Sequence, residues 1–220
     1  MTLFGLVRHG QTDYNANNLF QGSSDIPLNT AGIAQAHRAL EQVPDLSWDI
    51  VVSSPLSRAE QTARIIADDH SIPFTGTDPR LREIDWGLAE GQPVSTMLAT
   101  YPNRNFPGVE DSQAVADRGF EALSELASRF PDSKVLVVAH GTLIRFLISG
   151  IIGHGLPSLP NCALSQIAVN DRTWSVTMIA GTPWNHTVCI PAEADSVRFT
   201  ILPSFIHPAN SMPSPPVTSD

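Results

Sequence analysis

Gly5-Leu6-Val7-Arg8-His9-Gly10 and Leu136-Val137-Val138-Ala139-His140-Gly141 are two apolar runs that both end in His-Gly. A short apolar run that stops at a glycine turn is typical of a buried strand. Ligands of α/β proteins bind at the carboxyl ends of the parallel strands. The repeated ending therefore predicts that His9 and His140 face one ligand site. Taken singly, either histidine is more simply interpreted as a structural turn residue.

The rest of the chain alternates between strand-like and helix-like segments. The expected strands are 2–7, 49–53, 73–77, 134–139, 163–170 and 173–179, and the expected helices are 29–43, 54–69, 94–100, 112–129 and 142–152. This alternation indicates βαβ units. It predicts an α/β fold with three α/β/α layers and a mostly parallel central sheet. The last two strands, joined at residues 170–172, would form an antiparallel edge.

The chain of 220 residues is long enough for one domain with an appendage. We expect a domain over residues 1–180 and a C-terminal extension over residues 181–220. The extension is rich in proline, and we expect it to be poorly ordered after about residue 203 because it offers little apolar surface to bury.

The formal charge is −9, yet twelve of the thirteen basic residues are arginine and Lys134 is the only lysine. An acidic chain without basic runs argues against nucleic acids and anionic membranes as partners. Arginine suits bidentate contact with one small anion, although a codon bias toward arginine would explain the count equally well.

Cys162 and Cys189 form no CxxC pair. With no apolar run of about 18 residues and no signal peptide, we expect a cytoplasmic protein.

The residues around the two histidines favour an anion over a metal ion. Arg8 precedes His9 directly, and Arg58 lies at the start of the helix that follows the second strand. Guanidinium groups and helix N-terminal amides can together hold an oxyanion. Spacings of the HxxH or HExxH type are absent from the sequence, so we expect no metal. The alternative for Arg58 is a helix-surface residue paired with a carboxylate.

Several motifs in a fixed order resemble the histidine phosphatase superfamily, which has the phosphoglycerate-mutase-like fold. They are Arg8–Thr12 (RHGQT), Asn15, Phe20–Gly22 (FQG), Ser53–Ala59 (SSPLSRA) with Thr62-Ala63, Leu81–Ile84 (LREI) with Gly87 and Glu90-Gly91, and His140-Gly141. Each motif is weak alone. The resemblance rests on their order and covers about residues 1–180.

The resemblance implies a role for each of the central residues. It makes His9 the nucleophile that forms a phosphohistidine, and Glu83 the general acid. Arg8, Arg58 and His140 would hold the phosphoryl oxygens, which requires no cofactor. His9 must lack a proton while His140 is useful when charged, so we expect their environments to push their pKa values apart.

A second group of residues is expected to line the substrate site. It comprises Asn15, Gln11, Thr12, Gln21, Gly22, Gly141, Thr142, Trp86 and Arg104. Asn15, Gln21 and Gly22 could instead be turn residues, and Glu83 could be an exposed charge at a strand end. For Arg104, in a presumed cap, the hypothesis is contact with a second anionic group of the substrate. An exposed loop arginine is the alternative.

Hydrolysis is favoured over phosphoryl transfer between metabolites. The mutases of the family resemble one another in a long insertion that seals the phosphoenzyme from water. In this chain the corresponding stretch, from Glu83 to His140, is compact. Its arginines are Arg104, Arg118 and Arg129. We expect a phosphomonoesterase that acts on a small phosphoester, with a homodimer possible. The alternatives are a cofactor-dependent phosphoglycerate mutase and a non-catalytic phosphoester-binding module. Short motifs resemble both glucosyl-3-phosphoglycerate and alpha-ribazole phosphatases, so the substrate stays open.

Overall fold

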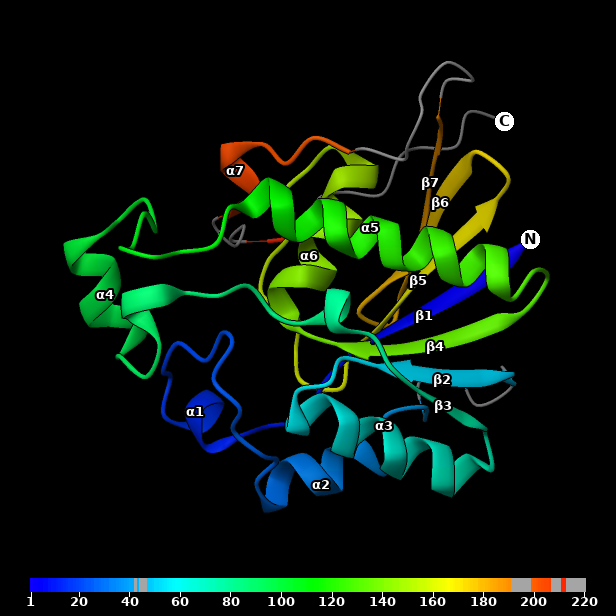
Figure 1. The fold of residues 1–220 in the computed structure, drawn as a ribbon, viewed down its shortest axis with the longest axis horizontal. Helices are drawn as coiled ribbons and strands as arrows, with labels where there is room; N and C mark the ends of the chain where they lie inside the picture. The colour runs from blue at the N-terminus through cyan, green and yellow to red at the C-terminus, as the bar shows by residue number, and fades with distance from the viewer. Residues whose placement is uncertain (42, 44–46, 191–198, 207–210, 213–220) are drawn as a thin grey trace.

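A computed structural model describes residues 1–41, 43, 47–190, 199–206 and 211–212. Its centre is a seven-stranded sheet with the order β3-β2-β4-β1-β5-β6-β7 (Figure 1). The strands β1 (Thr2–Arg8), β4 (Lys134–Ala139), β2 (Ile50–Ser53) and β3 (Phe74–Thr77) run parallel. These β1 and β4 strands are the two runs that end in His-Gly, and they are neighbours in the sheet.

Three antiparallel strands continue the sheet beyond β1. They are β5 (Leu164–Asn170), β6 (Thr173–Ile179) and β7 (Thr182–Cys189). The sequence predicted β5 and β6 but left the path of β7 open. β7 carries Pro183, which lacks an amide donor, and most of its side chains are not buried. Both features are compatible with an edge strand but weaken the sequence signal for one. β7 pairs with β6 although it lies in the stretch assigned to the C-terminal extension.

Helices cover both faces of the sheet. The long helices α5 (Ser112–Arg129) and α6 (Gly141–Ile152) lie on one face, and α2 (Thr30–Ala36) and α3 (Ser57–His70) lie on the other (Figure 1). Each face has its own apolar cluster, the larger one beneath α5 and α6. The near-continuous burial of β1 and β4 follows from this double cover. The predicted three-layer α/β/α fold is confirmed.

α2 is shorter than the helix expected over residues 29–43. Asn29 caps it through a side-chain bond to the Gly32 amide, as the sequence indicates. After Ala36 the backbone bonds tighten, since Arg38 donates to Gln35 and Ala39 to Ala36. Bonds between residues three apart mark a helix that gives way to tighter turns. Residues 42 and 44–46 lie outside the described residues.

The connection between β3 and α5 forms a cap beside the carboxyl ends of the parallel strands. It contains the short helices η1 (Pro79–Leu81), η2 (Gly87–Ala89) and α4 (Val94–Thr100), and the small helix α1 (Asp13–Ala16) lies near it at the same end (Figure 1). The cap has an aromatic centre. Phe106 packs edge-on against Phe20, Trp86 and Tyr101, with ring centroids 5.0, 5.9 and 5.8 Å away. These contacts join the cap to the loop that carries Phe20.

Part of the proline-rich tail packs on the domain. Residues 203–206 form the short helix α7 (Pro203–Ile206), in which Phe205 is buried. The expectation of poor order after residue 203 otherwise falls on residues 207–210 and 213–220, which lie outside the described residues. Among the described helices, none combines the length and the apolar character that a membrane crossing requires.

Candidate active site

His9 and His140 meet because the strands that precede them are paired. Arg8 is opposite Ala139 in the β1–β4 register, and the His9 amide donates to the Ala139 carbonyl at 3.0 Å. The two imidazole rings lie with their centroids 5.2 Å apart. Both side chains are buried at the carboxyl end of the sheet. The shared ligand site predicted from the repeated His-Gly ending has this geometry.

A backbone carbonyl sets the tautomer of His9. Its Nδ1 lies 2.7 Å from the Gly10 carbonyl oxygen, which can only accept, so Nδ1 carries the proton and Nε2 has the free lone pair. Burial lowers the pKa of His9 well below 6.5, and the positive charges of Arg58 and Arg8 lower it further. His9 is thus held as a neutral imidazole, the form that can act as a nucleophile.

His140 has a different hydrogen-bond environment. Its Nε2 lies 2.8 Å from Ser54 Oγ, and its buried Nδ1 has no partner among the described residues. Burial lowers its pKa well below 6.5, followed by the charge of Arg58. Both pKa values are thus shifted downward, because both imidazoles share one buried, arginine-rich environment. The expected separation between the two values stays a prediction.

Arg58 is fully buried, which rules out the surface alternative. Its Nη2 and Nη1 donate to the carbonyls of Gly22 and Ser24 at 2.7 and 2.8 Å. Its Nε has no partner among the described residues. Burial is the main reason that its pKa falls to about 10, a value at which it is still charged at neutral pH.

Glu90 holds the loop that orients Arg58. Its carboxylate accepts hydrogen bonds from the amides of Ser23 and Ser24 at 2.6 and 2.8 Å, and both hydroxyls donate to it as well. Gly22, at φ +50°, makes room for it, because a Cβ there would lie 2.1 Å from Glu90 Oε1. The sequence motif includes Glu90, but no role was assigned to it.

Arg8, at the end of β1, is the second guanidinium of the site. Its Nη1 donates to the Leu159 carbonyl, and its buried Nε has no partner among the described residues. Burial lowers its pKa, while the charge of Glu83 opposes that shift. Gly141 lies against it, since a Cβ at Gly141 would come within 3.2 Å of Arg8 Nε.

The carboxylate of Glu83 lies at the N-terminus of α6. Its Oε2 accepts from the Thr142 amide at 3.0 Å, and its Oε1 accepts from the Leu143 amide at 3.2 Å. A helix N-terminus favours negative charge at this point. Glu83 is half-buried and is thus not the exposed strand-end charge of the alternative interpretation.

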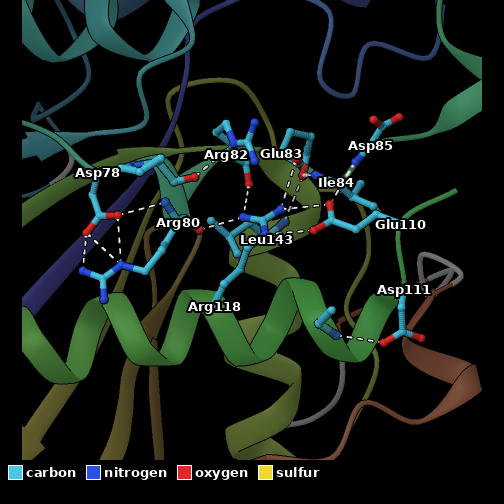
Figure 2. A network of polar contacts seen from close by, with 12 residues as sticks. Asp78, Arg80, Arg82, Glu83, Ile84, Asp85, Glu110, Asp111, Arg118 and Leu143 are labelled. Carbon is cyan, nitrogen blue, oxygen red and sulfur yellow. Dashed lines mark hydrogen bonds and ion pairs between the residues drawn. The ribbon is translucent and has the colours of Figure 1, made fainter.

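Arg118 of α5 fixes the segment that carries Glu83 (Figure 2). Its guanidinium donates to the carbonyls of Arg80 and Arg82 at 2.6 Å and to that of Glu83 at 3.1 Å. It also pairs with Glu110 at 3.0 Å, and this carboxylate accepts from the Asp85 amide at 3.1 Å. These bonds hold the irregular backbone on both sides of Glu83 against α5. The sequence named Arg118 only as one of the arginines in this stretch.

The amide side chains of Asn15 and Gln21 form another part of the site. Gln21 Oε1 accepts from Thr12 Oγ1 and Asn15 Nδ2, which leaves its buried Nε2 without a partner among the described residues. Asn15 also forms a capping box with Thr12 at the start of α1. Asn161, which the sequence did not single out, donates to the His9 carbonyl at 2.9 Å and holds Asn15 Oδ1.

These side chains surround a cavity of about 210 Å³. Of the residues that the sequence placed at the site, the cavity is lined by Arg8, His9, Asn15, Gln21, Gly22, Arg58, Glu83, Trp86, Arg104, Gly141 and Thr142. His140 lies behind His9. Gln11 and Thr12 are not among the lining residues, because Gln11 bonds to α2 and its cap residue Asn29 while Thr12 caps α1. Their assignment to the substrate site stays a prediction.

Arg145 of α6 is a charged lining residue that sequence reasoning missed. It is buried within an otherwise apolar helix, and this contrast is the signal that could have identified it. Burial lowers its pKa to about 10. The described residues hold no group of three or more histidine, cysteine, aspartate or glutamate side chains placed to bind a metal.

The chemical character of the site follows from its unpaired donors. Arg8 Nε, Arg58 Nε, Gln21 Nε2 and His140 Nδ1 are all buried without a hydrogen-bond partner among the described residues. Buried donors are rarely left unpaired, and an oxyanion with several acceptor oxygens can satisfy such a set. His9, whose Nε2 has a free lone pair, lines the same cavity as Arg8, Arg58 and Gln21. The arrangement can hold a tetrahedral anion against an imidazole.

Comparison with known proteins gives a consistent result. Residues 4–182 match the model of the histidine phosphatase superfamily (branch 1). The chain is 40% identical over 181 residues to the uncharacterized phosphatase PhoE of Bacillus subtilis (strain 168). These aligned residues cover 80% of this chain and 93% of PhoE. It is 34% identical over 187 residues to the probable phosphoglycerate mutase GpmB of Yersinia pestis (strain Pestoides F), covering 77% and 86%.

A solved structure supports the same likeness. The mycobacterial glucosyl-3-phosphoglycerate phosphatase in complex with VO3 superposes with a TM-score of 0.72 at 28% identity, covering 81% of this chain and 98% of that one.

Proposed function

Because the chain belongs to the histidine phosphatase superfamily (branch 1), we propose that it is a phosphomonoesterase that hydrolyses a small phosphorylated metabolite through a phosphohistidine at His9, without a metal ion. The observation that supports the proposal is that Arg8, Arg58 and Gln21, each with an unpaired buried donor, line the same cavity as His9, whose Nε2 has a free lone pair. A phosphoryl group supplies the oxygens that these donors lack.

In the first step His9 Nε2 attacks phosphorus and the bond to the ester oxygen breaks. Glu83 donates its proton to the departing oxygen, so that an alcohol leaves. In the second step Glu83 takes a proton from water, the oxygen attacks phosphorus, and the bond to His9 breaks to release inorganic phosphate. Both steps need mainly positioning and charge neutralisation, which the buried arginines supply.

His140 contributes through its unpaired Nδ1. Ser54 Oγ accepts from the Leu56 amide, so its hydroxyl proton can be donated to His140 Nε2. When the hydroxyl donates in this way, neutral His140 carries its proton on Nδ1, from which it can be donated to a phosphoryl oxygen. A bound dianion next to His140 would also raise the pKa of the imidazole, because opposite charge favours the protonated form.

Glu83 is suited to act at the opposite side of the phosphoryl group. The α6 amides of Thr142 and Leu143 orient its carboxylate, and it lines the same cavity as His9. A general acid must lie within reach of the leaving oxygen, and the position of Glu83 in the lining of this cavity supports that role. The half-burial of Glu83 supports this role over that of a surface charge.

The competing function is a mutase, which would hand the phosphoryl group to a second metabolite. The similarity of the chain to a probable phosphoglycerate mutase supports this second candidate function. The compact cap and the higher identity to a phosphatase support hydrolysis instead. Similar proteins of known structure include a glucosyl-3-phosphoglycerate phosphatase, a putative alpha-ribazole-5'-P phosphatase and a phosphoserine phosphatase mutant in complex with phosphoserine. A panel of such small phosphoesters is the appropriate substrate test.

The decisive experiment traps the phosphoenzyme. The protein is mixed with a ³²P-labelled phosphomonoester and quenched in alkaline denaturant, because a phosphohistidine bond is unstable in acid. We expect label on His9 and release of inorganic phosphate. His9→Asn should carry no label, and His37→Asn, which changes an exposed histidine, should behave like the wild type.

Failure of the experiment has distinct forms. Label without release of phosphate to water, but with transfer to an added acceptor, would identify a mutase. Binding with neither label nor release would identify a non-catalytic phosphoester-binding module.

A further inference from the structure

Arg145 adds a positive charge to the cavity that the phosphoryl site does not need. Its side chain is only 4% exposed, yet it lines the same cavity as Arg8, Arg58 and Arg104. Burial lowers its pKa first, and the neighbouring charge of Arg104 lowers it further. Within the described residues, neither Arg104 nor Arg145 forms an ion pair with a carboxylate. A buried arginine and a half-buried one, neither with an ion-pair partner in the described part of the chain, favour the binding of an anion, and Glu83 is the carboxylate whose charge acts on Arg145.

The guanidinium of Arg145 has a fixed orientation. Its Nε donates to the Leu156 carbonyl at 3.1 Å, and its Nη2 donates to the Phe205 carbonyl at 2.9 Å. Its Nη1 makes no hydrogen bond to the described part of the chain. A guanidinium held at two of its three nitrogens loses little further freedom when it binds a ligand.

One of these two carbonyls belongs to the C-terminal strap, which we define as residues 199–206. The strap crosses α5 and α6, and Gln113 anchors it. Gln113 Nε2 donates to the Phe199 carbonyl, and the Ile201 amide donates to Gln113 Oε1, both at 2.9 Å. The Phe199 ring lies 4.4 Å from that of Phe120. The strap is outside the family match, which ends at residue 182.

Arg104 borders the same part of the cavity. Its guanidinium carbon lies 5.5 Å from the Phe20 ring centroid and 5.7 Å from that of Trp86, and its buried Nε has no partner among the described residues. Aromatic faces position a guanidinium without consuming its hydrogen-bond donors. Arg104 is thus not the exposed loop arginine of the alternative interpretation.

We propose that Arg145, oriented by the C-terminal strap, binds a carboxylate on the leaving group of the substrate together with Arg104, and so selects phosphoesters that carry a second negative charge. The proposal rests on the proposed function, since it assigns the substrate class of the same site. The oxygens of the phosphoryl group already match the unpaired donors of Arg8, Arg58, Gln21 and His140. Nη1 of Arg145 and the guanidinium of Arg104 remain for a second, planar anion.

The test compares substrates that differ in one charge. Phosphate esters of 2-hydroxyacetate, 3-hydroxypropanoate and 4-hydroxybutanoate are assayed beside the phosphate esters of the matching hydroxyamides, which keep the shape and lose the carboxylate. For the best chain length we expect kcat/KM to be at least about tenfold higher for the acid than for the matching amide. The difference should arise from a lower KM for the acid, because a charge-assisted hydrogen bond contributes to binding. Arg145→Met should reduce this ratio to within about twofold of one.

Two further variants complete the comparison. Arg145→Lys, which keeps the charge and loses the fork, should retain part of the preference. Arg64→Met, which changes an exposed arginine, should retain all of it. A ratio near one in the wild type at every chain length, or an equal loss for acid and amide in Arg145→Met, would overturn the proposal.

The role of the strap is tested from α5. Gln113→Ala removes both bonds to the strap from outside the cavity. We expect KM for the acid to rise at least about threefold while KM for the amide stays constant. Glu121→Ala, on the same helix, is the matched control and should change neither. A change of both KM values by the same factor, or of neither, would show that the strap does not position Arg145.

A binding measurement separates this proposal from the proposed function. Phosphonate analogues, in which a methylene group replaces the ester oxygen, are titrated calorimetrically into the His9→Asn protein. If the carboxylated phosphonate binds more tightly than its amide, and Arg145→Met removes the difference, the subsite stands even if no ester is hydrolysed. If esters are hydrolysed but acid and amide bind and react alike, the proposed function stands and the subsite is refuted.

Discussion

The imidazole rings of His9 and His140 lie 5.2 Å apart with their planes tilted by 57°, although they follow strands from distant parts of the chain. Each ring has one nitrogen engaged by the protein, His9 with the Gly10 carbonyl and His140 with the Ser54 hydroxyl. The pairing of β1 with β4 brings the rings together, and these local bonds decide which nitrogen of each ring can meet a ligand.

Arg58 should contribute strongly to turnover, because it is a buried charge that no carboxylate of the described residues pairs with directly. We expect Arg58→Ala to lower kcat/KM by about 10²–10³-fold, the cost of removing one oxyanion-stabilising donor group. Steady-state kinetics on a phosphomonoester measure this. Arg64→Ala, on the exposed side of the same helix, is the control, and an equal effect of both variants would contradict the assignment.

Ser54 should act as a positioning residue for His140. Ser54→Ala removes the partner of His140 Nε2, and we expect kcat to fall by about 5–10-fold, since one hydrogen bond contributes roughly 1–1.5 kcal/mol. Ser149→Ala is the matched control, because the Ser149 hydroxyl is buried without a partner in the described structure. An unchanged kcat in Ser54→Ala would show that this bond does not orient His140.

Arg118 should support the general acid without touching the substrate. Arg118→Met removes three bonds to the backbone that carries Glu83 (Figure 2), and displacement of a catalytic group can lower the rate by about 10²-fold. Alkyl phosphates need protonation of the departing oxygen more than p-nitrophenyl phosphate does. We therefore expect the variant to impair alkyl esters far more.

The control for Arg118 is Arg129→Met on the same helix. Equal losses of activity toward alkyl phosphates and p-nitrophenyl phosphate in Arg118→Met would indicate general destabilisation rather than misplacement of Glu83.

The two buried histidines should make stability depend on pH. Their pKa values in the folded protein lie well below the ordinary 6.5, so between these values the unfolded chain binds more protons than the folded one. The free energy of unfolding is therefore not reduced by these histidines above pH 6.5. It decreases as the pH falls from 6.5 toward their pKa values in the folded protein. Each group contributes a slope of up to about 1.4 kcal/mol per pH unit.

Denaturant unfolding between about pH 5 and pH 7 measures this slope, a window above the ordinary pKa of carboxylates. The double variant His9→Asn/His140→Asn should show a flatter dependence. An equally steep loss of stability in the double variant would assign the effect to other groups.

Chelation should leave catalysis intact, because the proposed mechanism uses only protein side chains. Activity on a small phosphomonoester is measured after dialysis against EDTA and again after addition of Mg²⁺ or Zn²⁺. We expect equal rates in all three samples. Loss of activity with EDTA that a divalent ion restores would contradict the metal-free mechanism.

Patterns within short stretches predicted much of the fold and of the site. The apolar runs before His9 and His140 identify β1 and β4, because strands covered on both faces must be apolar throughout. β7 and the end of α2 were not predicted. β7 is stabilised by pairing with β6, and α2 gives way to tighter turns, neither of which leaves a clear local pattern.

The sequence by itself determined the chemistry at the strand ends, since the order of the motifs around His9, Arg58, Glu83 and His140 specifies which reactive groups follow which elements. Only the tertiary structure decided which other residues join them. It turns Gln11 toward α2 and brings Arg145 into the cavity through a carbonyl of the C-terminal strap. The physical reason is burial. A charged side chain deep in the protein is held by partners that are distant in sequence, and those partners exist only once the chain has folded.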